Sequence, residues 1–166
     1  MEIIFVSEKA LRLKSKTATF GIFGRDEKEK TVLDAIFSFG QATLDGETVI
    51  FTGPGEYEVK GVKITGEGKD ILRGFSGRIE NMQVFIGQAS TLGDPKDLPE
   101  ADVAIIRADV SMELKPIANL GAHLVVLSGP EALKIAQQLQ PDIQEVSKVA
   151  IIKDKLAEDM QVVVLG

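Results

Sequence analysis

The chain has 166 residues, of which 44% are hydrophobic and 27% charged, with no cysteine, no tryptophan and one histidine. Disulfides, cysteine nucleophiles and iron–sulfur clusters are therefore excluded, and one histidine without thiols cannot supply the usual nitrogen and sulfur ligands of zinc. Because 19 basic residues stand against 25 acidic ones, the net charge is −6 and the sequence pI is near 4.9, which disfavours nucleic acid as a partner.

The length fits a single domain, 1–166, because single cores extend to roughly 100–200 residues. No apolar run approaches the roughly 18–20 residues of a membrane helix. The first residues, Met1–Phe5, have neither the basic start nor the apolar core of a signal peptide. We therefore expect no contact with a membrane and a cytoplasmic location.

Short runs of β-branched and aromatic residues, separated by Gly, Pro, Asp and Lys, predict about eleven strands. The runs are Met1–Val6, Ala10–Leu13, Ala18–Phe23, Val32–Phe39, Thr48–Thr52, Glu56–Thr65, Met82–Gly87, Val103–Ala108, His123–Leu127, Val149–Lys153 and Gln161–Leu165. Val103–Ile106 and Leu124–Leu127 are apolar at consecutive positions, which predicts strands covered on both faces. Within Glu56–Thr65 the alternation changes phase at Gly61, which predicts a β-bulge there.

Helical signals come late in the chain. A helix is predicted to open at Gly129-Pro130-Glu131, to bury a face that starts at Ala132, and to end at Pro141. A second, shorter helix is predicted over Met112–Leu120, irregular at its internal proline. Loops are expected at 25–30, 66–78 and 93–101.

Three glycine-rich segments match phosphate or nucleophile motifs only in part. Gly53-Pro54-Gly55 precedes an acidic strand rather than a helix, so we interpret it as a tight turn. Gly66-Glu67-Gly68-Lys69-Asp70 lacks the Ser or Thr of a Walker motif, and Gly74-Phe75-Ser76-Gly77 lacks the spacing of a nucleophile elbow. We predict loops for both.

The titratable side chains form no self-contained motif. His123 begins an apolar run without a visible nucleophile or orienting partner, so we interpret it as a strand-end residue rather than a catalytic base. Asp45, Glu56, Glu58 and Asp94 are oxygen ligands of the kind that hard cations accept. Their spacing matches no dedicated cation loop, and solvated acids are the preferred interpretation.

The segment from Thr52 to Val62, Thr-Gly-Pro-Gly-Glu-Tyr-Glu-Val-Lys-Gly-Val, resembles a block of a compact bacterial group of metallo-β-lactamase-fold proteins, the predicted Zn-dependent hydrolases. Leu33–Phe39 resembles the strand before the family's metal motif, Thr91–Asp94 its Leu-Gly-Asp segment, and Ala101–Ile106 the buried strand after it. The C-terminal Lys148–Leu156 and Val162–Leu165 also resemble the end of that group. The resemblance implies an α/β (α+β) fold, a β-rich αββα sandwich of metallo-β-lactamase type, shortened to its sheets and a few helices.

The resemblance also implies where the metal ligands of the family would stand. The aligned site positions are Gly40, Ala42, Leu44, Asp45, Thr91, Asp94 and Gly129, the last interchangeable with its neighbour Ser128. The family's His-x-His-x-Asp-His motif falls on residues 40–45, and only Asp94 keeps a matching ligand type, that of the bridging aspartate. One carboxylate does not hold zinc alone, so these residues imply no zinc, no other cofactor and no catalytic residue.

We therefore expect a metal-free protein of this fold that has lost hydrolase activity and has a binding or assembly role. One alternative is a hydrolase that uses Asp45 and Asp94 with magnesium or manganese. Another is a subunit that self-associates through an open sheet edge, most simply as a homodimer. The sequence identifies neither the ligand nor the partner.

Overall fold

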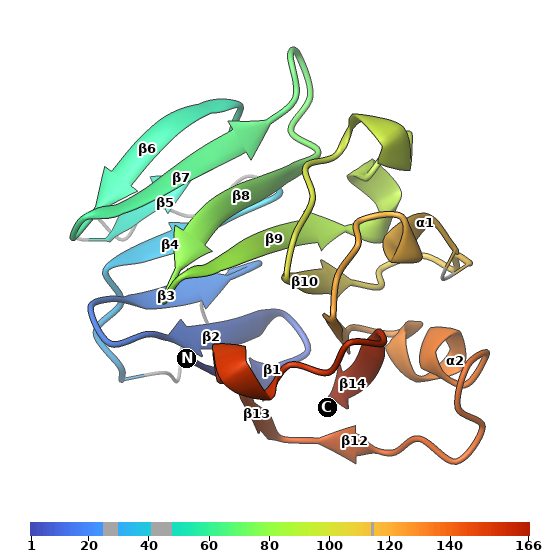
Figure 1. Ribbon diagram of the computed structural model, residues 1–166. Coiled ribbons are helices and arrows are strands. Elements are labelled where there is room, and N and C mark those ends of the chain that lie inside the picture. Colours follow the sequence, from blue (N-terminus) through green and yellow to red (C-terminus); the bar gives the residue numbers. More distant parts are fainter. Residues whose placement is uncertain (25–29, 41–47, 114) are drawn as a thin grey trace.

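The computed structural model describes residues 1–24, 30–40, 48–113 and 115–166 and contains two β-sheets (Figure 1). Sheet A consists, in spatial order, of β13 (Lys148–Ala150), β1 (Glu2–Ser7), β2 (Ala10–Lys14), β3 (Thr19–Ile22), β4 (Ala35–Phe37) and β5 (Val49–Phe51). Sheet B consists of β12 (Glu145–Val146), β14 (Gln161–Leu165), β11 (Leu124–Ser128), β10 (Val103–Arg107), β9 (Met82–Gln88), β8 (Gly74–Ile79), β7 (Val62–Glu67) and β6 (Gly55–Val59).

The helical elements are short. They are α1 (Lys115–Ala118), α2 (Ala132–Ala136) and the 3-10 turns η1 (Ala89–Thr91), η2 (Pro95–Asp97) and η3 (Lys153–Lys155). No helix in the described ranges is long and apolar enough to cross a membrane. Both predicted helices exist, but α2 stops at Ala136, before the predicted end at Pro141, and α1 covers only the centre of the predicted Met112–Leu120.

Strand direction gives the sandwich two distinct ends. The strands β6 to β9 form an antiparallel meander, whereas β9, β10, β11 and β14 are parallel. In sheet A, β3, β4 and β5 are parallel as well. The last residues of the parallel strands therefore gather at one edge of each sheet, and Arg107 pairs in register with Gln88 on one side and Ser128 on the other.

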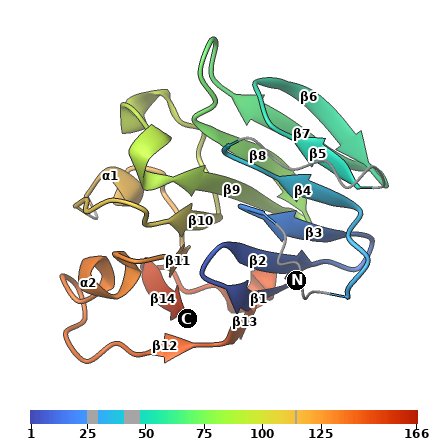
Figure 2. The same cartoon turned by 180° about the vertical axis from the view of Figure 1, so that it is seen from behind.

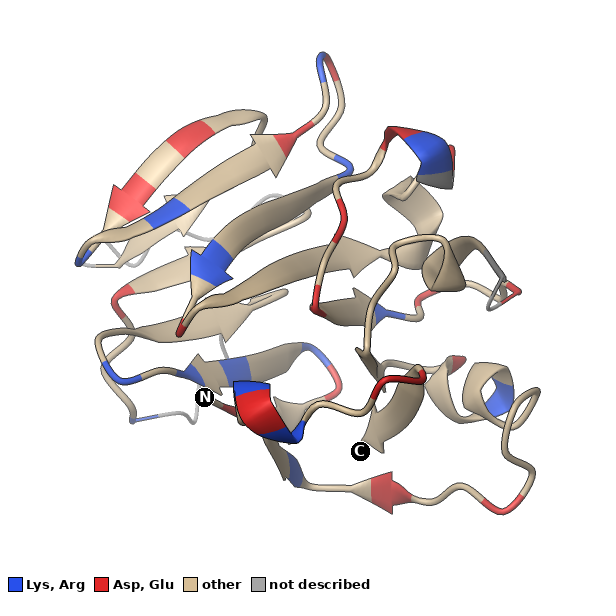
Figure 3. Cartoon of the chain, in the orientation of Figure 1, with Lys and Arg blue, Asp and Glu red and all other residues tan. Residues whose placement is uncertain are grey.

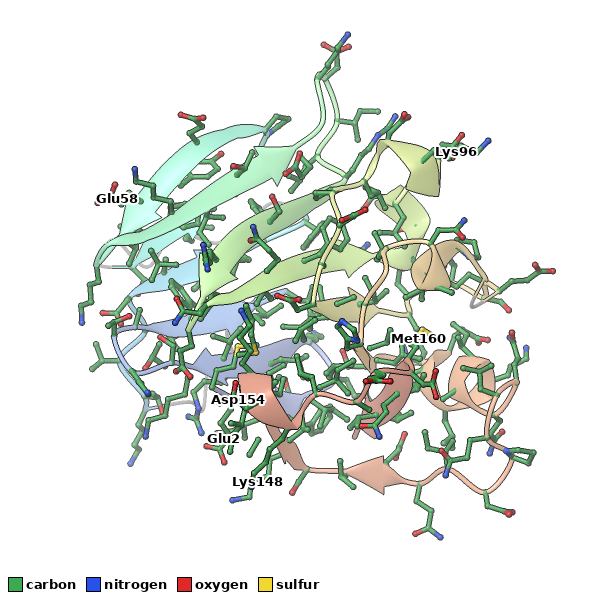
Figure 4. All side chains as sticks on the ribbon, viewed as in Figure 1. Glu2, Glu58, Lys96, Lys148, Asp154 and Met160 are labelled. Atoms are coloured by element: carbon green, nitrogen blue, oxygen red, sulfur yellow. The ribbon has the colours of Figure 1, made fainter. Side chains whose placement is uncertain are left out.

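The main core lies between the two sheets, because alternate residues of each strand point to the facing sheet. Phe20 and Phe37 come from sheet A, and Phe75 and Ile86 come from sheet B; all four are buried. The rings of Phe37 and Phe75 meet across the layer with centroids 5.1 Å apart. At the surface of sheet A, Nζ of Lys148 lies 3.6 Å from Glu2, which links β13 to β1 (Figure 4).

A second cluster covers the outer face of sheet B. Ala104 and Val125 pack there against Ile117 of α1 and Ile135 of α2. Both views of the ribbon show these helices on the same side of the molecule (Figures 1 and 2). The consecutive apolar residues of β10 and β11 are thus buried from both faces, which confirms the expectation from the sequence. The predicted strand-rich α/β sandwich is confirmed.

The bulge predicted at Gly61 is wrong, because Glu56–Thr65 forms a hairpin of two strands. Val59 of β6 pairs with Val62 of β7, and the two residues between them, Lys60 and Gly61, have φ of 48° and 78°. Positive φ at both central positions is typical of a two-residue hairpin turn. The apolar residues change from odd to even positions at Gly61 because the chain reverses there. The second strand then places its own apolar residues against the core.

The loop predicted over 66–78 is only partly correct, since its second half is β8. Phe75 and Ile79 are buried in this strand. A Cβ on Gly74 would stand 2.7 Å from the Ile86 carbonyl oxygen, so the glycine permits a close approach to β9. Glycine lowers the strand signal in the sequence, although here the packing requires it. The two-residue β12 was not predicted either.

Candidate functional site

The loops that follow β3 and β4 of sheet A and β9, β10 and β11 of sheet B meet at one end of the sandwich, which we call the carboxyl end (Figure 1). Phe23, after β3, lies under the guanidinium of Arg107, the last residue of β10, with Cζ 5.9 Å from the ring centroid. Phe39, after β4, contacts Phe23 at 5.7 Å and Phe75 at 5.4 Å between ring centroids. These contacts connect sheet A to sheet B, and the carboxyl ends of parallel strands commonly bind ligands in α/β proteins.

The four described positions that align with family ligands lie in loops after these strands: Gly40 after β4, Thr91 and Asp94 after β9, and Gly129 after β11. Thr91 is half-buried in η1, just after β9, and its hydroxyl donates a hydrogen bond of 3.2 Å to the Gln88 carbonyl. Gly129 follows β11 with φ of +99°, and a Cβ built on it would lie 3.4 Å from Cγ of Arg107. Gly40, two residues after Ser38 at the end of β4, is exposed. Ala42, Leu44 and Asp45 lie outside the described residues.

Asp94 serves a different local role. Its side chain is exposed, and Oδ1 accepts a hydrogen bond of 3.0 Å from the Lys96 backbone N–H. Its carbonyl accepts a second bond, of 3.1 Å, from Asp97 N–H. Both bonds stabilise the start of η2, as Asp side chains commonly do at turns. None of the hydrogen bonds found for Asp94 reaches Thr91 or Gly129.

The described residues of this end do not fit a zinc ion. Within the ranges that the structure covers, no three His, Cys, Asp or Glu side chains are close enough together to hold a metal. Thr91, Gly129 and Gly40 offer no imidazole, thiolate or carboxylate, and Asp94 holds η2. Zinc sites in proteins need three or four such ligands.

A polar network ties two of the loops together. Asp109, in the segment after β10, accepts hydrogen bonds from Gln88 Nε2 at 2.8 Å, from Ser90 N–H at 3.0 Å and from the Ser90 hydroxyl at 2.5 Å. These donors reach both carboxylate oxygens. The network fixes the loop after β9 against the loop after β10.

Arg107 is a residue at this end that the sequence analysis did not single out. Its Nε is fully buried and has no hydrogen-bond partner. No hydrogen bond or ion pair found among the described residues involves its guanidinium. The available signal was weak, since Arg107 is one cation directly after the apolar run Val103–Ile106, a position that is ordinarily a solvated strand end.

An open groove of about 880 Å³ lies beside Thr91. It runs between the connection from β7 to β8 and the loop after β9, and Glu67, Arg73 and Gly93 contribute to its lining. Arg73 is paired across it with Asp97 at 3.0 Å. The groove is therefore lined by charges of both signs, of which Arg73 and Asp97 are paired with each other.

The block that carries the resemblance forms a corner between the sheets. Gly53–Tyr57 takes the chain from β5 to β6, and the Tyr57 hydroxyl donates a 2.7 Å hydrogen bond to the Gly53 carbonyl. The ring of Tyr57 stacks on Phe51 with centroids 4.4 Å apart, and Gly55 has φ of +143°. Gly53 and Pro54, which were interpreted as part of a tight turn, form a bend between the strands, and Gly55 already belongs to β6. We call Gly53–Tyr57 the corner.

The other acids and the histidine singled out in the sequence stand apart from the carboxyl end. Glu56 and Glu58 are exposed on β6, where the acidic bands are visible in Figure 3 and the outward side chain of Glu58 in Figure 4. His123 immediately precedes β11, at the opposite end of the strand from Ser128, and Nδ1 lies 3.2 Å from the Glu158 carbonyl. Its position agrees with a strand-end residue.

Two carboxyl groups have perturbed pKa values. A hydrogen bond from Lys60, with Nζ 2.8 Å away, and one from Thr19 N–H lower the pKa of Asp34 against the effect of burial. Burial raises the pKa of Glu80, but the α-ammonium of Met1 at 2.7 Å and Lys16 N–H at 2.8 Å outweigh it, so the pKa lies below its usual value. Glu80 occupies the turn between β8 and β9 and Asp34 precedes β4, so each stabilises the entry to a strand.

No family model matches the chain, and no curated protein matches it. Solved structures are similar over nearly the whole chain. A "putative Zn-dependent hydrolase of the metallo-beta-lactamase superfamily" from Thermotoga maritima superposes with a TM-score of 0.72 and 18% identity, over 99% of this chain and 97% of that one. A "putative metal-dependent hydrolase" from Parabacteroides distasonis superposes with a TM-score of 0.58 and 12% identity, over 99% and 93%. This chain therefore has the metallo-β-lactamase fold.

Proposed function

We propose that this protein uses the metallo-β-lactamase fold to bind a ligand or partner at the carboxyl end, without a metal and without hydrolysis. The observation that carries the proposal is the local role of the side chains at the aligned ligand positions. The Thr91 hydroxyl bonds to its own turn, the Asp94 carboxylate holds η2, and Gly129 has no side chain. A hydrolase of the kind implied by the resemblance needs a metal-bound hydroxide, and these groups do not hold the metal.

The solved structures are compatible with this proposal. Their names describe hydrolases dependent on zinc or another metal, whereas the identity to this chain is 18% and 12%. At that distance the fold is shared, but the chemistry depends on residues that each chain supplies separately. We also propose a cytoplasmic location, which fits a chain without cysteine.

The direct test is the metal content of the full chain purified without chelators. We expect zinc, iron and manganese far below one equivalent, and no rise in melting temperature when zinc is added. Tightly bound metal at one or more equivalents per chain would overturn the proposal, because ligand-bound metal stabilises the folded state by mass action.

The carboxylate-based hydrolase is tested separately. Phosphodiester and ester substrates are screened with manganese on the wild-type chain, on Asp94→Ala and on Asp70→Ala, an exposed acid between β7 and β8 that serves as the matched control. The same background rate in all three proteins supports a binding role. Turnover that is lost only in Asp94→Ala contradicts it and assigns a catalytic function to that carboxylate.

A further inference from the structure

The inter-sheet face ends in a row of polar residues at the carboxyl end. Ile86, Ile105 and Val126 occupy the same register in β9, β10 and β11, and all three belong to the core between the sheets. Two residues later, still on the inward phase, stand Gln88, Arg107 and Ser128, again in mutual register. The apolar layer is thus closed at this end by a cation between two hydrogen-bonding side chains.

Arg107 is half-buried, and the burial of its Nε has a cost that the described protein atoms do not compensate. Its Nε has no hydrogen-bond partner, and a buried polar group without one destabilises the folded state. Among the described residues, the one specific contact of the guanidinium is with the face of Phe23, 5.9 Å from Cζ to the ring centroid. A cation–π contact orients the guanidinium plane but leaves its N–H groups free to donate elsewhere.

The acids in the neighbouring loops differ in how they are satisfied. Asp109 accepts three hydrogen bonds from Gln88 and Ser90. Glu131, two residues after Gly129, has Oε2 3.4 Å from Nζ of Lys134, and this buried oxygen has no hydrogen-bond partner. Neither carboxylate forms an ion pair with Arg107. The guanidinium is therefore available as a donor for an anion that is not part of these loops.

The aromatic residue below the guanidinium has an unusual backbone. Phe23 has φ of +70°, which is rare and costly for an aromatic residue. Its N–H donates to the Phe37 carbonyl at 2.8 Å, and its ring contacts Phe39. Strained residues of this kind concentrate at ligand-binding positions, where the surrounding structure holds them. Here the strain places a ring beside the unpaired cation.

We propose that Arg107 binds the carboxylate of a small aromatic acid, whose ring contacts Phe23 and Phe39. The planar guanidinium donates two parallel N–H bonds, which match the two oxygens of a carboxylate. A single cation balances one negative charge. The protein's net charge of −6 disfavours ligands that carry more than one negative charge. This inference rests on the proposed binding function and names the chemical class of its ligand.

The test uses benzoate as the probe, with benzamide as the uncharged isostere and phenyl phosphate as the dianion, each titrated by calorimetry into the full chain. We expect saturable binding of benzoate, with a dissociation constant at or below the millimolar range, and at least ten-fold weaker binding of both other probes. Arg107→Met is expected to lose benzoate binding, and Arg107→Lys to weaken it, because lysine keeps the charge and loses the two-pronged geometry.

Arg78→Met is the matched control, since Arg78 is an exposed arginine of β8 in the same sheet, and it is expected to bind benzoate like the wild type. Unfolding of each variant by urea shows that it is folded before it is titrated. No saturable benzoate binding to the wild type, equal binding by Arg107→Met, or equal binding of benzamide would each overturn the proposal. Tighter, Arg107-dependent binding of phenyl phosphate would overturn the choice of a carboxylate.

The two proposals fail in different ways. Stoichiometric metal in the purified chain overturns the metal-free binding function whatever benzoate does. A metal-free chain that does not bind benzoate overturns only the assignment to Arg107.

Discussion

The corner and the carboxyl end both join sheet A to sheet B, but they differ in how their groups are satisfied. At the corner, the Tyr57 hydroxyl bonds to Gly53, its ring stacks on Phe51, and the neighbouring β7 has a glycine, Gly66, where the Gly53 carbonyl approaches closely. At the carboxyl end, Arg107 has a buried unpaired nitrogen and Phe23 a strained backbone. The most distinctive block of the sequence thus stabilises the fold, whereas the unpaired group belongs to a residue without a motif.

The largest effect is expected from Gly66→Ala, at the contact of β7 with the corner. Gly66 of β7 pairs with Gly55, and a Cβ on it would stand 2.3 Å from the Gly53 carbonyl oxygen. Because backbone must move to relieve this clash, we expect a loss of about 3 kcal/mol in the free energy of unfolding, measured with urea. Gly40→Ala, with nothing within 4 Å of the added Cβ, is the control and should change stability by less than about 0.5 kcal/mol. Similar values for both variants would contradict the rigid corner.

A smaller loss is expected for Tyr57→Phe. The variant keeps the ring on Phe51 and removes only the hydroxyl that donates to the Gly53 carbonyl. One hydrogen bond of this kind contributes about 1 kcal/mol. Urea unfolding should therefore show a lower midpoint with an unchanged m-value. An unchanged midpoint would mean that water replaces the tyrosine hydroxyl without cost.

The paired carboxylate of Glu80 makes the stability of the fold depend on pH. Its pKa in the folded state lies below the ordinary 4.5, so its contribution is present above that pH and is lost as the pH falls through the folded value. Glu80→Gln should cost about 1 kcal/mol or less at pH 7, because solvent screens the pair, and should flatten the loss of stability below pH 4.5. Melting curves from pH 7 to pH 3 measure both effects.

Glu58→Gln is the matched control for Glu80, since Glu58 is an exposed acid on β6. Its melting curves should follow those of the wild type at every pH. If Glu80→Gln also follows the wild type, the ion pair with the α-ammonium of Met1 does not stabilise the fold.

Most of the fold was predictable because its strands carry their own signals. The strands β10 and β11 are apolar at consecutive positions, and this alone indicates layers on both faces. The hairpin at Lys60-Gly61 was mistaken for a bulge because both change the apolar phase, and only strand pairing distinguishes them. The strand β8 was missed because Gly74 and Gly77 are set by the close approach of β7 and β9, which lie elsewhere in the chain.

The candidate site was predictable only in outline. The resemblance directed attention to Thr91 and Gly129, and the structure places both in loops at the carboxyl end. Arg107 was not predicted as a site residue, because a cation after a buried strand is ordinarily solvated. The unpaired state of its Nε and its contact with Phe23 depend on loops from both sheets. A local sequence pattern does not predict contacts between such distant segments.

The smallest change in stability is expected for Arg107→Met, and this result would separate the carboxyl end most sharply from the corner. Methionine keeps the apolar stem and removes the unpaired Nε, and this gain offsets the loss of a cation–π contact worth about 0.5–1 kcal/mol. We expect the free energy of unfolding to stay within about 0.5 kcal/mol of the wild type, measured with urea. A loss as large as that of Gly66→Ala would show that Arg107 holds the sheets together, as the corner does, and is not kept free for a ligand.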